Sequence, residues 1–171
     1  MPIVDTDLLL RLSGGAANTD PDLALGGIMS TTTAISPTVA EENLFNNFTA
    51  AETTAGSTKY RGLYLLNNHG SISLTASAVY IPTQTPSTTT AVAIALAGEG
   101  LNATMETIAT ELVAPVGESF TAPATFGAGL STGSVPAGQR YGLWVRVIVD
   151  ALSPAYDNDD YQIAWQGTTI A

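Results

Sequence analysis

The sequence predicts an all-β protein, either an antiparallel β-sandwich or a jelly roll. Segments in which apolar and polar residues alternate at period two recur along the 171 residues, separated by turns rich in Gly, Pro and Asn. Strand and helix patterns do not alternate as they do in parallel α/β folds. We expect roughly seven to nine short strands in one domain with an arm. The absence of a fixed repeat argues against a propeller or a solenoid.

The clearest strand is predicted over residues 141–150, after a turn over 136–139 that contains Pro136 and Gly138. One face of this strand is apolar throughout and belongs against a core. The other face is mixed, and Trp144 close to Arg146 indicates that a neighbour covers it. Trp144 then lies either inside the sandwich or at a subunit contact, and we favour the sandwich interior.

The first 43 residues are predicted to form an extended, irregular N-terminal segment or arm, followed by a β-sandwich domain over 44–171. The segment contains a first strand at 8–12 and a short strand at 29–35, with turn residues between them. Such a polar stretch is expected to be ordered only where it lies on a partner or on the body of the protein. Its apolar residues are the anchor candidates: Leu23, Leu25, Ile28 and Met29.

Two short helical turns are predicted before the main body of strands. Ser36 followed by proline is a helix start signal. Thr49 with Glu52 three residues later matches a capping box, and Gly56 is suited to end that helix.

The strands of the body are predicted from the alternation that begins at Lys59. A strand over 59–67 places Arg61 on the same face as two leucines, and the Asn-Asn-His-Gly sequence at 67–70 indicates a hairpin. The return strand of that hairpin is expected to end at Pro82. Residues 105–113 are ambiguous between a helical turn and a strand, and we favour a strand. The other predicted strands cover 71–81, 91–97, 119–122 and 161–168.

The composition indicates a protein that assembles with other subunits. Hydrophobic residues make up 45% of the chain and charged residues only 12%, against about 25% in typical soluble domains. The surface is therefore rich in Thr, Ser, Asn, Ala and Gly, whereas a free monomer usually carries more charge. The net charge of −10 argues against a nucleic-acid-binding protein, because phosphate neutralisation needs clustered Lys and Arg.

No membrane or secretory segment is predicted. The apolar run near the N-terminus follows Asp5 and Asp7, which is the wrong charge for a signal peptide, and is too short to span a bilayer. The chain contains no Cys, so disulfides, thiolate metal sites and a cysteine nucleophile are excluded. We expect a protein that is made in a cytoplasm and contacts no membrane.

The search for catalytic chemistry finds few candidates. His69 is the only histidine and lies in a predicted turn, so catalytic triads and two-histidine metal sites lack partners. A carboxylate pair such as Glu106 with Glu111 would suffice for glycoside hydrolysis, but nothing marks either as held in an apolar pocket. We therefore expect no enzyme, no catalytic residue and no cofactor.

Two binding alternatives remain open from the residues. The acidic stretch 157–160 has oxygen ligands suited to calcium, although it lacks EF-hand spacing and a plain turn explains it better. Trp144, Trp165 and Tyr156 are candidates for a sugar-binding aromatic platform. Both tryptophans lie inside alternating strands, which favours packing in a core or an interface.

Three segments resemble virion structural proteins of tailed bacteriophages. The first, KYRGLYLLNN at 59–68, follows Leu44-Phe45 and the turn at 52–56, and the second is PAGQRYGLWVR at 136–146. The upstream NTDP at 18–21, with LGG at 25–27 and Ser30, is similar to the N-terminal segment of the same family. Together these segments cover about a third of the chain, and they carry no catalytic residue.

The resemblance implies a capsid decoration, or cement, protein on the outer face of the phage head. Its partner would be the major capsid protein, and such proteins form homodimers or homotrimers and reach across neighbouring capsid subunits. The interface candidates are Leu23, Leu25, Ile28, Met29, Trp144 and Arg146. A phage tail or surface carbohydrate-binding module is the alternative.

Overall fold

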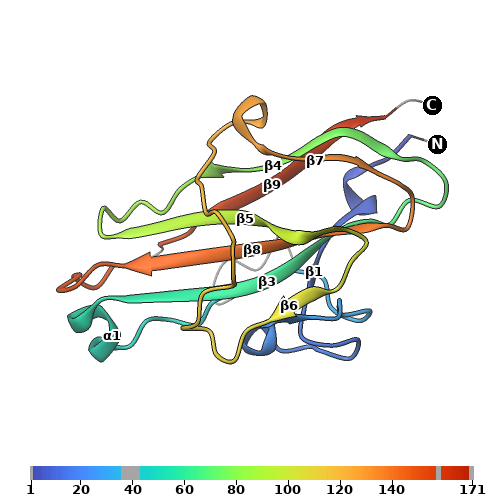
Figure 1. Cartoon of the computed structure of the whole chain (residues 1–171). Helices are drawn as coiled ribbons and strands as arrows, with labels where there is room; N and C mark the ends of the chain where they lie inside the picture. The colour runs from blue at the N-terminus through green and yellow to red at the C-terminus, as the bar shows by residue number, and fades with distance from the viewer. Residues whose placement is uncertain (1, 36–42, 157–158, 170–171) are drawn as a thin grey trace.

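The protein is a β-sandwich of two antiparallel sheets, which confirms the predicted fold class. The computed structural model describes residues 2–35, 43–156 and 159–169. A four-stranded sheet has the strand order β1-β3-β8-β5, a three-stranded sheet has the order β7-β4-β9, and β2 and β6 form a separate pair. Figure 1 shows the three-stranded sheet as one layer above the four-stranded sheet.

The described elements are three 3-10 helices, one α-helix and nine strands. The helical elements are η1 (Asp5–Asp7), η2 (Pro21–Leu23), α1 (Ala50–Ala55) and η3 (Phe126–Ala128). The strands are β1 (Leu8–Leu12), β2 (Gly26–Gly27), β3 (Ser57–Asn67), β4 (Leu74–Thr83), β5 (Thr90–Leu101), β6 (Met105–Thr107), β7 (Leu130–Val135), β8 (Arg140–Val149) and β9 (Gln162–Thr169).

The main hydrophobic core lies between the two sheets. Strand β8 contributes its odd-numbered residues, and these align with the apolar face of β3 through pairs such as Leu63 with Leu143. The opposite layer is supplied by the inward face of the three-stranded sheet. Members of this core with 2% exposure or less include Leu63, Leu65, Leu143, Val145, Val92, Ile94, Leu74, Val79, Ile81 and Val135.

The outer face of the four-stranded sheet is also buried, under a layer that we call the cover. The cover consists of residues 13–30 and 105–120, which include β2 and β6. It packs on Trp144, Tyr64 and the alanines of β5, which form a second hydrophobic cluster. The described part of the N-terminal segment therefore packs against the body of the protein.

At Gly26 the backbone of the cover lies in close contact with the backbone of Glu106 and with the ring of Trp144 in the sheet. Its φ of +89° is unfavourable for other residues, and a Cβ here would lie 1.8 Å from the carbonyl oxygen of Glu106 and 3.0 Å from the Trp144 ring. Gly26 is thus required both by its backbone conformation and by the space available.

Gly26→Ala is expected to loosen the cover and to lower the free energy of unfolding by about 1–3 kcal/mol through backbone strain and the clash. Gly15→Ala is the matched control: its φ is also positive, at +120°, but no atom lies within 4 Å of the added methyl. Chemical denaturation followed by tryptophan fluorescence measures both. Equal losses in the two variants would show that only the backbone conformation matters at Gly26.

The predicted hairpin at 67–70 is wrong. Strand β4 leaves the sheet of β3 and pairs instead with β7 and β9 in the other layer. The Asn67 side chain donates to the carbonyls of Ile72 and Val135, each at 2.9 Å, and so joins the two layers at this corner. His69 acts as a turn residue, since its Nδ1 accepts hydrogen bonds from the backbone of Ser71 and Ile72.

Other predicted elements are confirmed or shortened. The first strand is confirmed at Leu8–Leu12, and the helix over 50–55 has the predicted capping box and ends at Gly56. The predicted strand at 29–35 is reduced to one bridge between Ala34 and Arg11, and that at 119–122 to one bridge between Thr121 and Ile94. Strand β6 covers only the start of 105–113. The helix predicted at Ser36 lies outside the described residues.

One side of the sandwich is closed and the other is open. Between β5 and the three-stranded sheet, residues 121–123 span the gap, because Ile94 exchanges backbone hydrogen bonds with Thr121 and Ile81 donates to Pro123. Between the opposite edge strands, β1 and β9, hollows remain along the seam.

Candidate functional site

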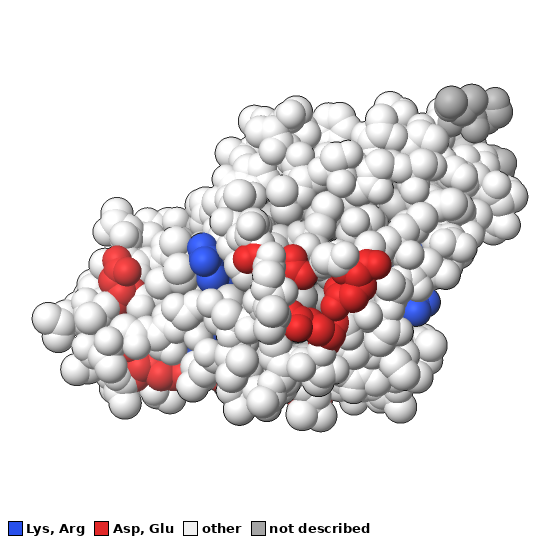
Figure 2. Space-filling view, viewed as in Figure 1, with Lys and Arg blue, Asp and Glu red and all other residues white. Residues whose placement is uncertain are grey.

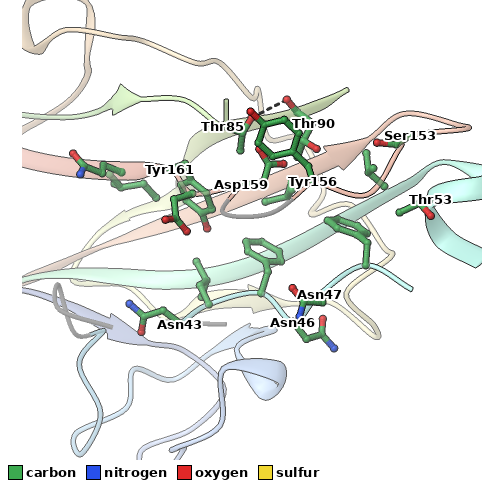
Figure 3. A pocket seen from close by; sticks show the side chains of 18 of the residues that line it. Asn43, Asn46, Asn47, Thr53, Thr85, Thr90, Ser153, Tyr156, Asp159 and Tyr161 are labelled. Atoms are coloured by element: carbon green, nitrogen blue, oxygen red, sulfur yellow. Dashed lines mark hydrogen bonds between the residues drawn. The ribbon is translucent and has the colours of Figure 1, made fainter. Parts of the chain in front are cut away.

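The larger hollow is a cleft at the open side of the sandwich. It has a volume of about 1260 Å³ and lies between the inner faces of the sheets, next to residues 43–48 and the start of β9. Figure 3 shows Tyr156, Asp159 and Tyr161 on one side of the cleft and Asn43, Asn46 and Asn47 on the other. The amide oxygen of Asn46 accepts a hydrogen bond from Lys59. Such a lining provides apolar contacts and hydrogen-bonding groups, and it lacks a histidine.

Asp159 and Tyr161 are the acidic and phenolic groups of the cleft whose surroundings the structure defines. Asp159 accepts a hydrogen bond of 3.0 Å from the backbone of Ser87. Burial raises the pKa of Tyr161 above its usual range, although the nearby Arg61 opposes the shift. The described residues include no group of three or more His, Asp or Glu able to hold a metal ion. The calcium alternative at 157–160 falls partly on residues outside the described ranges.

A buried cation pair, which sequence reasoning missed, lies on the inner face of β3. Lys59 is 2% exposed and Arg61 is 1% exposed, and both occupy the face that continues from the leucines of the core. Lys59 is 3.1 Å from Glu52 and 3.4 Å from Glu111, while Arg61 is 2.8 Å from Asp22 and also paired with Glu111. We call these five residues the ion-pair cluster.

The ion-pair cluster joins four separate parts of the chain. Its residues come from η2, α1, β3 and the loop after β6, of which the first and the last belong to the cover. The ring of Phe48 lies over Lys59 with 4.7 Å between ammonium and ring centre, and Phe45 lies over Arg61 at 5.4 Å. These contacts fix residues 45–48 against the sheet through cation–π attraction.

The capping helix contributes Glu52 to this cluster, and 24% of that side chain is exposed. Partial burial pushes the pKa of Glu52 upward, but hydrogen bonds from Thr49 and Lys59 outweigh that effect, so the pKa lies below its ordinary value. A carboxylate with a lowered pKa adds stability at neutral pH that is lost as the pH falls through that pKa. The sequence signal for the cluster was Lys59 and Arg61 on one apolar face.

The cover divides the predicted anchor residues into two pairs. Leu25 and Met29 are half-buried and pack against the cluster around Trp144. Leu23 is 58% exposed and Ile28 is 55% exposed, so both project from the cover. The first pair fixes the cover to the sheet, and the second remains accessible.

Further apolar side chains are exposed on the other part of the cover. Leu112 is 60% exposed and Val116 is 83% exposed. Ala24 and Glu111 are bound to neighbouring positions on the edge of β3, because their carbonyls accept from Gly62 and Tyr60. The exposed Leu23 and Leu112 are therefore each next in sequence to a residue that the edge of β3 holds in place.

Trp144 and Arg146 do not form an exposed contact surface on the monomer. Trp144 is completely buried, as favoured from the sequence, but it lies under the cover rather than between the two sheets. Its indole N–H has no hydrogen-bond partner among the described residues. Arg146 is half-buried, with its guanidinium 4.9 Å from the centre of the Phe120 ring.

Both tryptophans are buried, as favoured from the sequence, so they do not form an exposed aromatic platform for sugar binding. Trp165 is 6% exposed and lies in the core, where its indole donates to Thr132. Because Trp144 is also buried, Tyr156 is the only one of the three candidates that is exposed, and it lies at the cleft.

The carboxylates considered for glycoside hydrolysis have different partners. Glu106 accepts a backbone hydrogen bond from Val116, while Glu111 belongs to the ion-pair cluster. Burial raises the pKa of Glu118, opposed by its bond from Gly98 and supported by the charges of nearby Glu99 and Glu106. Glu106 therefore ties two parts of the cover together, and Glu118 ties the cover to β5, in both cases through a backbone N–H group.

Charge is strongly segregated between the two halves of the molecule. Residues 70–98, 119–139 and 161–169 contain no Asp, Glu, Lys or Arg, and they include all three strands of the β7-β4-β9 sheet. Figure 2 shows acidic side chains gathered around the position of β6, whereas the half over β4, β7 and β9 is white. Among the described residues, no helix is long and apolar enough to cross a membrane.

Comparisons with family models, curated proteins and solved structures found no significant match to this chain.

Proposed function

We propose that the protein is a bacteriophage capsid decoration protein that docks on the outer face of the head through the cover. The observation that carries this proposal is the exposure of Leu23, Ile28, Leu112 and Val116 on a layer that is itself tightly fixed to the sheet. A rigid surface with accessible apolar side chains loses little conformational entropy when it binds. The resemblance of three segments to phage virion proteins supplies the identity of the partner, the major capsid protein.

Such a protein would act by mass action and without catalysis. A protein that binds only the assembled shell stabilises that state, and contacts that bridge neighbouring subunits add avidity. The protein would then be found on the capsid surface of the virion. The acids of the cover, which hold backbone N–H groups, would keep its loops in shape for docking.

The double variant Leu23→Ser/Ile28→Ser is expected to weaken binding to expanded heads by about 100-fold. Burying a fully exposed side chain of this kind contributes about 1.5–3 kcal/mol, and these two side chains are 58% and 55% exposed. Co-sedimentation with purified heads over a range of protein concentrations measures the affinity. Leu152→Ser is the matched control, since Leu152 is 81% exposed in the loop after β8, away from the cover. Docking through the cover is refuted by unchanged affinity in the double variant or an equal loss in the control.

A further inference from the structure

The edges of the four-stranded sheet are covered by irregular segments of the same chain. On β1, the backbone of Leu10 accepts from Ile35 and that of Leu12 donates to Thr33. On β5, Ile94 and Thr121 exchange two hydrogen bonds. Residues 57–62 of β3 extend beyond β1, and the backbone of the cover donates to or accepts from this part of the edge at Tyr60 and Gly62. Edge strands are commonly protected in this way against pairing with other chains.

Strand β9 is an edge strand without such protection. Its eight residues pair with β4 on one side, and in the described part of the chain no backbone hydrogen bond joins β9 to any further segment. The other edge of the same sheet, β7, has six residues and contains Gly133 with a φ of +67°. A short strand with such an irregularity deters pairing, whereas β9 is longer and its own φ angles are all negative.

The side chains around β9 also lack the usual deterrents. The strand contains no charged residue and no proline, which natural edge strands use to avoid association. On the outer face, Thr168 pairs with Thr75 and Gln166 pairs with Tyr80, each at 3.0 Å, so its polar groups are neutral and already satisfied. Charged residues do lie near the strand: Asp5 lines the smaller hollow between β1 and β9, and Asp159 and Asp160, just before β9, line the cleft.

We propose that β9 pairs antiparallel with β9 of a second copy of the chain, so that two three-stranded sheets become one six-stranded sheet. A two-fold axis through this pair would satisfy both free edges at once and close the assembly as a dimer. The inference goes beyond docking on the head, because the cover lies on the opposite side of the sandwich and stays free in such a dimer.

The charge distribution favours a second copy as the occupant. Two chains of net charge −10 repel each other over most of their surfaces. The repulsion is weakest where the uncharged sheets meet, because the acids of the cover then lie away from the contact and only Asp5, Asp159 and Asp160 are described near β9. A basic partner protein would instead be attracted to the acidic cover, which carries Glu99, Glu106 and Glu118 at or near its edge.

The test places lysine at the proposed contact. Gln166→Lys/Thr168→Lys puts two cations beside the free edge, where a two-fold axis brings like charges together. Ser131→Lys/Ser134→Lys is the control, because it makes the same change at exposed positions of β7 in the same sheet. Both variants lower the net negative charge equally, so general repulsion between copies falls by the same amount in each.

Sedimentation velocity over a concentration series should give the wild type twice the monomer mass of 17.6 kDa. The β9 variant should dissociate with a Kd at least tenfold higher, while the β7 variant stays dimeric and both keep the wild-type far-UV spectrum. Hydrogen exchange should show the amides of β9 protected in the wild type and exchanging faster in the β9 variant.

A wild type that is monomeric at every concentration, or one that forms trimers, overturns the proposal. So does a β9 variant that stays dimeric, or a β7 variant that dissociates to the same extent. Head binding is measured separately by co-sedimentation, so failure of the dimer and failure of docking through the cover give different results.

Discussion

Trp144→Ala is expected to lower the free energy of unfolding by about 3–5 kcal/mol, the usual cost of removing a large aromatic ring from a core. The ring is completely buried and lies against Gly26, so its loss leaves a cavity between the sheet and the cover. Urea denaturation followed by far-UV circular dichroism measures the change. Because the ring supports the cover, the variant should also bind heads more weakly.

Trp144→Phe is the control for this variant. Phenylalanine keeps most of the buried apolar area and removes the indole N–H that lacks a partner among the described residues. Removal of an unsatisfied buried donor offsets part of the lost contact area, so a loss below about 2 kcal/mol is expected. A Trp144→Ala protein as stable as the wild type would contradict the role of Trp144 in fixing the cover.

Arg61→Ala is expected to destabilise the protein by about 3–5 kcal/mol, because it removes one partner of a buried ion pair. Asp22 and Glu111 would lose their guanidinium, and Phe45 would lose the cation beneath its ring. The loss should change little with added salt, since buried pairs are screened less than exposed ones. Denaturation at low and high ionic strength measures both effects.

Arg11→Ala is a suitable comparison for Arg61→Ala. Arg11 is half-buried in β1, and its guanidinium donates to the carbonyl of Thr31 at 2.9 Å. Among the described residues it has no carboxylate within ion-pair distance. Its removal should cost less than about 1 kcal/mol. If Arg61→Ala costs no more than this, the ion-pair cluster does not join the cover to the body of the protein.

Local sequence patterns predicted the elements of this fold well where apolar and polar residues alternate within a single strand. Strand β8 is confirmed over nearly the expected residues, and the capping box of α1 follows from Thr49 and Glu52 alone. Strand β7 was missed because its sequence, LSTGSV, has few apolar residues and a glycine with positive φ. Its strand character depends on pairing with β4.

The arrangement in space depended on partners far along the chain. The turn signal at 67–70 is genuine, but it does not specify whether β4 returns to the same sheet or crosses to the other layer. The same holds for the ion-pair cluster. The sequence shows Lys59 and Arg61, two of the five Lys and Arg residues of the chain, on the same strand face as Leu63. The carboxylates that pair with them come from distant segments, so the sequence does not indicate the pairing.

The cover was predicted only in part. The four anchor residues were identified together, but a sequence cannot show which side of an irregular segment faces the sheet. The structure assigns Leu25 and Met29 to the inside and exposes Leu23 and Ile28. The charge-free sheet could have been found from the sequence, because residues 70–98, 119–139 and 161–169 lack charged residues.

The strand order of the larger sheet also constrains how the protein is made. Strand β3 lies between β1 and β8. The centre of that sheet therefore forms only when residues 140–149 are available to pair with residues 57–67. Pairings between segments so far apart in sequence are formed slowly. A ribosome must therefore synthesise the chain at least through Val149 before this sheet can be completed.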